Sequence, residues 1–216
     1  MALPLSLRNS LAELILASLH DAEARRALDA VATLCIAPRG RPCAVDVPAG
    51  MTRGFFQEAE GRLRLRSEWS EHASDLRERS ARAARAIGDR PLDPPDPTLE
   101  SALDAAALLF DAGLYFEVHE LLEPYWVRAE GSDRIALQGL IQVAVGFEHL
   151  VNDNVKGGHA LLASGCDKME GRALLGLDLD RFARDVRRFV TDGATLGGTS
   201  LRPFDRTVVP RFPSRV

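Results

Sequence analysis

The sequence has no run of apolar residues that approaches the roughly 20 needed to span a membrane. Its first eight residues also lack the basic start and the long apolar core of a signal peptide. Cysteine is scarce, with three among 216 residues and no two of them spaced as C-x-x-C. These absences argue against a membrane protein and a disulfide-stapled secreted fold, and they predict free thiols in a cytoplasmic protein.

Lysine is nearly absent. Only two of the 27 Lys and Arg residues are lysines, Lys156 and Lys168, which leaves 25 arginines. The net charge is nevertheless -4 and the sequence pI about 5.8, so no overall basic field attracts nucleic acid. We attribute the arginine excess to a compositional bias, because alanine is abundant too. Nucleic acid is therefore not the expected partner, and the arginine-rich segment 67–90 is the one place that keeps this alternative open.

Proline is concentrated in the segment 91–97, where four of seven residues are proline. Such a segment cannot continue a helix and is typical of a stiff linker. We therefore expect a mostly helical N-terminal region over residues 1–90, a helical bundle over 98–192 and an extended tail over 193–216. With 46% hydrophobic and 27% charged residues, the composition is that of a globular protein. The predicted fold class is mainly α.

In the N-terminal region the apolar spacing predicts helices and short strands. Helices are expected over residues 6–20, 22–34 and 67–87, and a strand is expected over residues 43–47. Leu63 and Leu65 alternate with arginines, so the segment 55–66 is expected to form a β-hairpin or, alternatively, helical turns on either side of Gly61.

In the second half the pattern predicts an antiparallel bundle of four helices. They are expected over residues 98–123, 133–151, 155–170 and 179–191. Thr98 and Asp178 are the expected N-caps of the first and the fourth. The second helix is apolar on nearly every face, which indicates that the others surround it. Short connections make successive helices antiparallel.

The first of these helices carries His119, Glu123 and Trp126 in an H-x-x-x-E-x-x-W run. Helical spacing places them on one face with apolar residues such as Tyr115. A buried carboxylate is costly unless a cation, a metal ion or hydrogen bonds compensate it. The pair of His119 and Glu123 is therefore the strongest indication of a functional site.

A second polar row lies on the following helix. Gln138, Gln142 and His149 share one face there, and buried amides and imidazoles need partners. We expect the two rows to face each other across the antiparallel pair. The predicted internal pocket consists of Tyr115, His119, Glu123, Trp126, Gln138, Gln142 and His149. The residues expected in solvent instead are Glu117, Glu120 and Glu148.

Two interpretations of this pocket remain open. In the first, His119, Glu123 and His149 bind a divalent ion such as Zn or Fe(II), and Gln142 orients a ligand or a bound water. In the second, Glu123 holds His119 by a hydrogen bond, and the glutamines complete a structural network that needs no ion.

The same residues carry a resemblance to a known family. The H-x-x-x-E-x-x-W run within residues 109–126 is followed by Gln-Gly-Leu-Ile-Gln at 138–142, by His149 and by the segment 154–160. Over about residues 103–169 the chain resembles the bacterial and archaeal domain-of-unknown-function 309 family. The resemblance implies an all-helical bundle, names His119, Glu123 and Trp126 as functional residues, and suggests metal binding. It implies no reaction, because the family has none established.

Two functions are compatible with these patterns. The first is a metal-dependent hydrolase, in which the ion activates water, Gln138 and Gln142 position the substrate, and Trp126 forms a wall of the pocket. The second is a non-catalytic module that binds a small molecule or a protein partner through the pocket.

Overall fold

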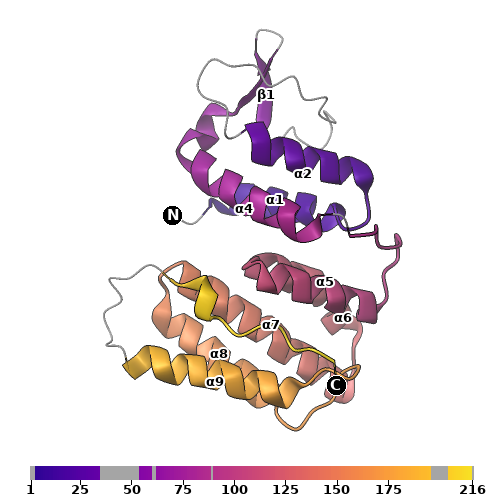
Figure 1. The fold of residues 1–216 in the computed structure, drawn as a ribbon, viewed down its shortest axis with the longest axis vertical. Coiled ribbons are helices and arrows are strands. Elements are labelled where there is room, and N and C mark those ends of the chain that lie inside the picture. The colour runs from indigo at the N-terminus through magenta and orange to yellow at the C-terminus, as the bar shows by residue number, and fades with distance from the viewer. Residues whose placement is uncertain (1–2, 35–53, 60–61, 89, 196–203, 216) are drawn as a thin grey trace. The chain divides into compact units, whose positions relative to one another are not determined.

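The computed structural model describes residues 3–34, 54–59, 62–88, 90–195 and 204–215. The chain divides into two compact units, Met1–Pro97 and Thr98–Val216, which are described one at a time (Figure 1). The described residues form eight α-helices and one two-stranded sheet, so the mainly α fold class is confirmed. None of these helices combines the length and the apolar character that crossing a membrane requires.

The N-terminal unit is helical with one hairpin. Its elements are α1 (Leu5–Ala17), α2 (Ala22–Leu34), β1 (Phe56–Ala59), β2 (Arg62–Leu65), the 3-10 helix η1 (Ser67–His72) and α4 (Ala73–Ile87). Before α2, Asp21 Oδ1 accepts the N–H of Glu23 at 2.7 Å, as an N-cap does. The strands are antiparallel with Phe56 opposite Leu65, so the hairpin is confirmed and the helical alternative is wrong. The strand expected at 43–47 lies outside the described residues.

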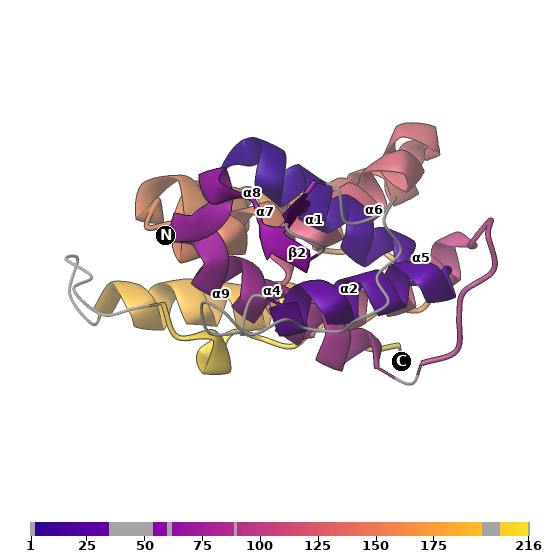
Figure 2. The ribbon, with the colours of Figure 1, turned by 90° about the horizontal axis from the view of Figure 1, so that it is seen from above.

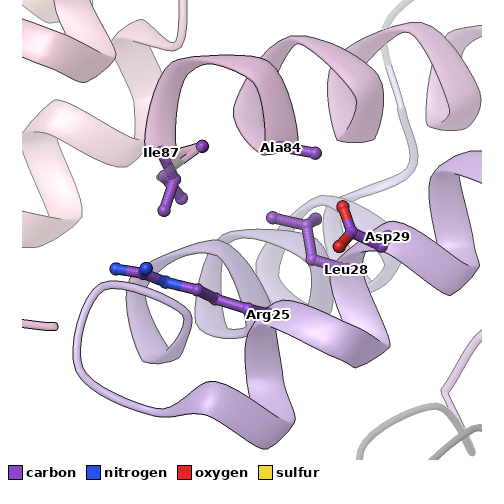
Figure 3. A pocket seen from close by; sticks show the side chains of 6 residues that line it. Arg25, Leu28, Asp29, Ala84 and Ile87 are labelled. Carbon is purple, nitrogen blue, oxygen red and sulfur yellow. The ribbon is translucent and has the colours of Figure 1, made fainter. Parts of the chain in front are cut away.

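Arg25 ties the connections of this unit together. Its Nε donates to the carbonyl of Ser18 at 2.8 Å, and its terminal nitrogens donate to the carbonyls of Arg90 and Pro91. The start of the proline-rich linker is thereby held at the corner between α1 and α2. A pocket of about 160 Å³ lies between α2 and α4. Figure 3 shows Arg25 among the side chains that line it. The other residues that line it are Leu28, Asp29, Ala84, Ile87 and Gly88.

The C-terminal unit is a helical bundle with a tail. Its elements are α5 (Leu99–Asp111), α6 (Tyr115–Arg128), α7 (Gly131–Val151), α8 (Val155–Met169), α9 (Leu179–Thr195) and the 3-10 helix η2 (Arg206–Val208). Both expected caps are present. Thr98 Oγ1 accepts the N–H of Ser101 at 3.2 Å, and Asp178 Oδ1 accepts the N–H of Arg181 at 3.0 Å.

The single helix expected over residues 98–123 is wrong, because the chain forms α5 and α6 there. Between them it turns through Gly113, which has a φ of 71°. This left-handed conformation is one that glycine adopts without the steric cost of a Cβ. The turn lets α6 pack back on α5, and it adds a helix to the expected bundle.

α6 passes through Pro124 and ends at Arg128, beyond the expected end. Proline removes one backbone hydrogen bond from the helix. Arg134 at the start of α7 closes the helix end, because its Nη1 donates to the carbonyls of Trp126 and Val127 at 3.1 and 3.0 Å. The corner between α6 and α7 is thus fixed by one guanidinium.

Aromatic rings form the centre of the C-terminal unit. The ring of Phe110 lies 5.1 Å from Tyr115, 5.7 Å from both Phe147 and Phe182, and 5.6 Å from Phe212, measured between centroids. The contacts with Tyr115, Phe147 and Phe182 are edge-on, an arrangement that aromatic pairs favour. These rings join α5, α6, α7, α9 and the tail into one core.

The C-terminal tail lies along its own unit, beside α5 and α9 (Figures 1 and 2). The N–H of Phe212 donates to Asp111 Oδ1 at 2.9 Å, and Arg215 pairs with Asp104 at 2.6 Å. The N–H of Asp178 donates to the carbonyl of Ser214 at 2.9 Å. The described part of the tail is therefore an integral layer of the bundle.

Cys166 on α8 is a buried free thiol whose Sγ lies 3.5 Å from the carbonyl oxygen of Ala183. Burial raises the pKa of this thiol from 9.0 to about 11. The thiolate is the reactive form. We therefore expect Cys166 to resist alkylation by iodoacetamide at a pH near 8 in the folded protein. The variant Cys35→Ser/Cys43→Ser leaves Cys166 as its one cysteine, and mass spectrometry follows the reaction. Equal alkylation rates for native and unfolded protein would contradict this.

The same shift makes stability depend on pH. An unfolded chain loses the Cys166 proton near pH 9, whereas the folded chain keeps it until about pH 11. Ionisation therefore favours the unfolded state at high pH. The contribution of this thiol to stability is fully present below pH 9 and is lost as the pH rises toward 11.

Candidate metal centre

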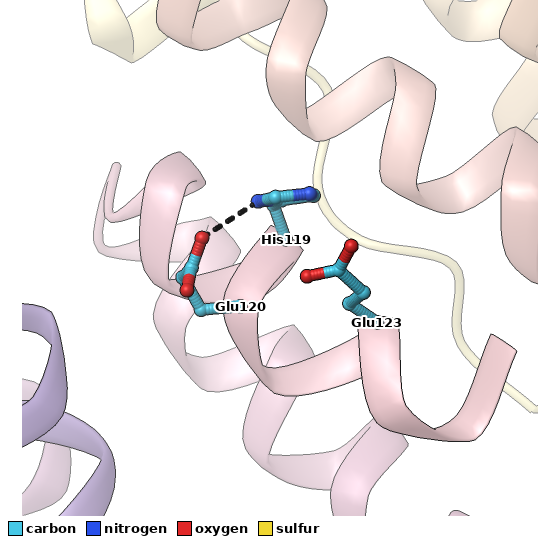
Figure 4. A group of neighbouring side chains, drawn as sticks. All are labelled: His119, Glu120 and Glu123. Carbon is cyan, nitrogen blue, oxygen red and sulfur yellow. Dashed lines mark hydrogen bonds and ion pairs between the residues drawn. The ribbon is translucent and has the colours of Figure 1, made fainter. Parts of the chain in front are cut away.

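His119, Glu120 and Glu123 lie together within one turn of α6 (Figure 4). Each offers one donor atom for a metal ion, and these atoms lie within 4.8 Å of one another. His119 Nδ1 lies 3.0 Å from Glu120 Oε1. Figure 4 shows the two carboxylates on either side of the ring, with the second ring nitrogen on the side of Glu123.

The group is open to solvent on one side. The side chain of His119 is 27% exposed and that of Glu120 is 38% exposed, while Glu123 is exposed. Glu123 is thus not the buried carboxylate that the sequence indicated. Instead, Glu117 and Glu148 are buried, with 0% and 6% exposed, although both were expected in solvent.

The buried position of these two carboxylates has a structural reason. Glu117 lies two residues from His119, and helical geometry directs it to the opposite side of α6. Glu148 near the end of α7 accepts a hydrogen bond from the side-chain amide of Asn152 at 3.3 Å. The spacing of the apolar residues could not predict this burial, because such spacing assigns charged residues to the solvent side of a helical bundle.

Tyr115 and Trp126 are placed differently from each other. Tyr115 is 1% exposed and belongs to the aromatic core around Phe110. Trp126 is half-buried, and the guanidinium of Arg134 lies 4.7 Å from the centroid of its indole ring. This is a cation–π contact, and it keeps the indole at the corner between α6 and α7.

The polar row of α7 is half-buried rather than internal. Gln138, Gln142 and His149 all have intermediate exposure. Gln142 Oε1 accepts a hydrogen bond from Ser164 of α8 at 3.1 Å. The row therefore contacts the following helix, α8.

His149 is engaged at the corner between α7 and α8. Its Nδ1 lies 2.8 Å from Asn154 Nδ2, and Asn154 Oδ1 accepts the N–H of Gly157 at 3.1 Å. The amide nitrogen of Asn154 is therefore the donor and His149 Nδ1 the acceptor. Within the described ranges, the group that includes His119 and Glu123 has Glu120 as its third member and does not include His149.

The sequence reasoning missed Glu120, Ser164 and Lys168. For Glu120 a signal was present, because residues 119, 120 and 123 fall within one helical turn. For Ser164 and Lys168 the signal was weaker. Lys168 lies one turn after its partner Ser164 on α8. Gln142, the partner of Ser164, lies on another helix, so only the register of two packed helices brings Ser164 and Gln142 together.

A comparison with known proteins finds a family match in this part of the chain. Residues 103–161, from α5 into α8, match the family described as "Domain of unknown function (DUF309)". No curated protein and no solved structure matches the chain. The resemblance seen in the sequence is confirmed: the segment 103–161 of this chain is a match to the domain-of-unknown-function family DUF309.

Proposed function

We propose that this protein binds a divalent metal ion at His119 and Glu123. The observation that carries the proposal is the gathering of His119, Glu120 and Glu123 donor atoms within 4.8 Å. An imidazole nitrogen combined with carboxylate oxygens is a donor set that suits Zn or Fe(II). Partial exposure gives an ion a route to the site.

Glu120 fits the role of a positioning residue. When Nδ1 of His119 donates to Glu120 Oε1 at 3.0 Å, the lone pair of the ring lies on Nε2. Metal-binding histidines commonly donate their other ring N–H to a carboxylate, which fixes the tautomer and the direction of the ring. Glu120 then holds the ring so that Nε2 and the Glu123 carboxylate serve as donors on the same side.

The reaction that suits this site best is hydrolysis. Few protein donors on a half-exposed helix leave coordination positions for water and substrate, as in catalytic rather than structural metal sites. A bound ion supplies a water of lowered pKa. In this proposal Gln138 and Gln142 position the substrate from α7, and the substrate is a small molecule.

A non-catalytic binding module is the second candidate. The hydrogen bond between Ser164 and Gln142 favours it, because it shows that part of the polar row is satisfied without an ion. The metal content of the protein distinguishes the two candidates.

We expect protein purified without chelator, or titrated with Zn or Fe(II), to carry the ion in a fixed ratio by elemental analysis. His119→Ala and Glu123→Ala should lose it, because each removes a donor. Glu120→Gln should raise the dissociation constant by about 10- to 100-fold, the usual effect of a residue that orients a ligand.

His149→Ala is the matched control and should keep the ion, because the His149 ring is engaged with Asn154. Wild-type protein that carries no ion and takes up none on titration would overturn the metal proposal. Loss of the ion in His149→Ala would instead restore His149 as a ligand.

A further inference from the structure

A hydrogen-bonded cluster outside the proposed metal centre joins α7 and α8. Lys168 Nζ donates to Ser164 Oγ at 3.0 Å, and Ser164 Oγ donates to Gln142 Oε1 at 3.1 Å. The order of donors is fixed, because an ammonium group only donates and a hydroxyl has one proton to give. All three residues are half-buried. The amide nitrogen of Gln142 and two N–H groups of Lys168 are not used in this chain of bonds.

Lys168 has no carboxylate within 4.0 Å among the residues that the structure describes. The acidic residues near Lys168 in the sequence form ion pairs with Arg187 of α9 instead. Arg187 lies 2.7 Å from Asp167 and 3.1 Å from Glu170. The ammonium group of Lys168 therefore has a serine hydroxyl, and no carboxylate of the described residues, as its partner.

The position of Lys168 is set by the close packing of α7 on α8. A Cβ on Gly139 would lie 2.9 Å from the carbonyl oxygen of Gly165 and 3.3 Å from Lys168 Cβ. The base of the Lys168 side chain therefore lies close to the backbone of α7 at Gly139. A lysine held in this way loses less side-chain entropy when it binds a ligand than a free surface lysine does.

We propose that Lys168, Ser164 and Gln142 form a binding site for a phosphate group. The remaining donors are N–H groups of an ammonium and an amide, and the serine hydroxyl joins the ammonium to the Gln142 side chain of α7. Lysine binds phosphate as a point charge. The site shares Gln142 with the row proposed to position the substrate, but it contains none of the proposed metal donors, so phosphate binding and metal binding are tested separately.

The scarcity of lysine makes this site directly observable. Protein labelled with ¹³C-lysine has two ε-methylene signals, from Lys156 and Lys168, and Lys156→Arg assigns them. Inorganic phosphate is added at constant ionic strength, with chloride as the balancing salt. We expect the Lys168 signal to shift and saturate, while the signal of the exposed Lys156 on the same helix stays in place.

The second measurement is the thermal midpoint of unfolding, which is compared between the wild-type protein and its variants. Phosphate should raise the thermal midpoint of wild-type protein and of Lys156→Met, because a ligand that binds only the folded state stabilises it. In Lys168→Met this rise should be lost, with binding weakened about tenfold or more as for the loss of a charge-assisted hydrogen bond. Ser164→Ala should weaken it less.

Four outcomes overturn the proposal. Equal shifts of both lysine signals would show general screening of charge, and a shift without saturation would show no site. If phosphate still raised the thermal midpoint of Lys168→Met, then it would bind elsewhere or would stabilise the protein only because the salt is excluded from its surface. Acetate that shifts Lys168 as strongly as phosphate does would remove the assignment to phosphate.

Discussion

Phe110→Ala is expected to lower the free energy of unfolding of the C-terminal unit by about 3–5 kcal/mol, the range for large aromatic side chains removed from a core. Phe110 is 2% exposed and lies within 5.7 Å of four other rings, measured between centroids. These rings come from α6, α7, α9 and the tail, so no single neighbour can move to fill the space. The loss is therefore expected at the upper part of that range.

Urea unfolding followed by the fluorescence of Trp126 measures this effect. Trp69→Phe removes the other tryptophan, so the signal reports on the C-terminal unit alone. Phe204→Ala is the matched control. Phe204 is half-buried and has ring contacts with Phe147 and Phe189 only at 6.4 Å, so its loss should be clearly smaller. Equal losses in the two variants would show that Phe110 does not organise the core.

The helices were predictable where local signals mark their ends. Thr98 and Asp178 bond to backbone N–H groups a few residues ahead, so they are recognised from the sequence. The break between α5 and α6 was not, because apolar residues at 108, 112 and 115 keep a helical spacing across it. Only Gly113 marks it, and a glycine within an apolar pattern does not by itself show a positive φ.

The candidate site was predictable to the extent that it is local. His119 and Glu123 lie one turn apart on a helix, so spacing alone brings them together. The exposure of Glu123 depends on how α6 packs against its neighbours, and no spacing gives that. Contacts such as Ser164 with Gln142 join residues 22 positions apart, and they follow from the register of α7 on α8.

This register depends on glycines that face each other. A Cβ on Gly165 would lie 2.8 Å from the carbonyl oxygen of Gly139 and 3.1 Å from the backbone nitrogen of Val143. Both are backbone atoms, so they cannot turn away as the end of a side chain can. The two helices have to separate before any side chain larger than hydrogen fits at residue 165.

Gly165→Ala is therefore expected to destabilise the C-terminal unit by a net of about 1–2 kcal/mol, because the overpacking costs about 2–3 kcal/mol, the upper part of the range for overpacked cores. Alanine favours a helix over glycine by about 1 kcal/mol, which offsets only part of the cost. Urea unfolding with the Trp126 signal measures the net change. Ala160→Gly on the exposed face of the same helix is the control, and it should cost about 1 kcal/mol through helix propensity alone.

The same variant connects packing with function. If the helices separate at Gly165, Lys168 and Gln142 move apart, and the saturable response of Lys168 to phosphate should weaken even where the protein stays folded. Binding of metal at His119 and Glu123 should remain, because these donors lie within one turn of α6 and do not depend on α8. A Gly165→Ala protein more stable than wild type would mean that α7 and α8 are not packed this closely. The phosphate site would then lose the arrangement that fixes its lysine.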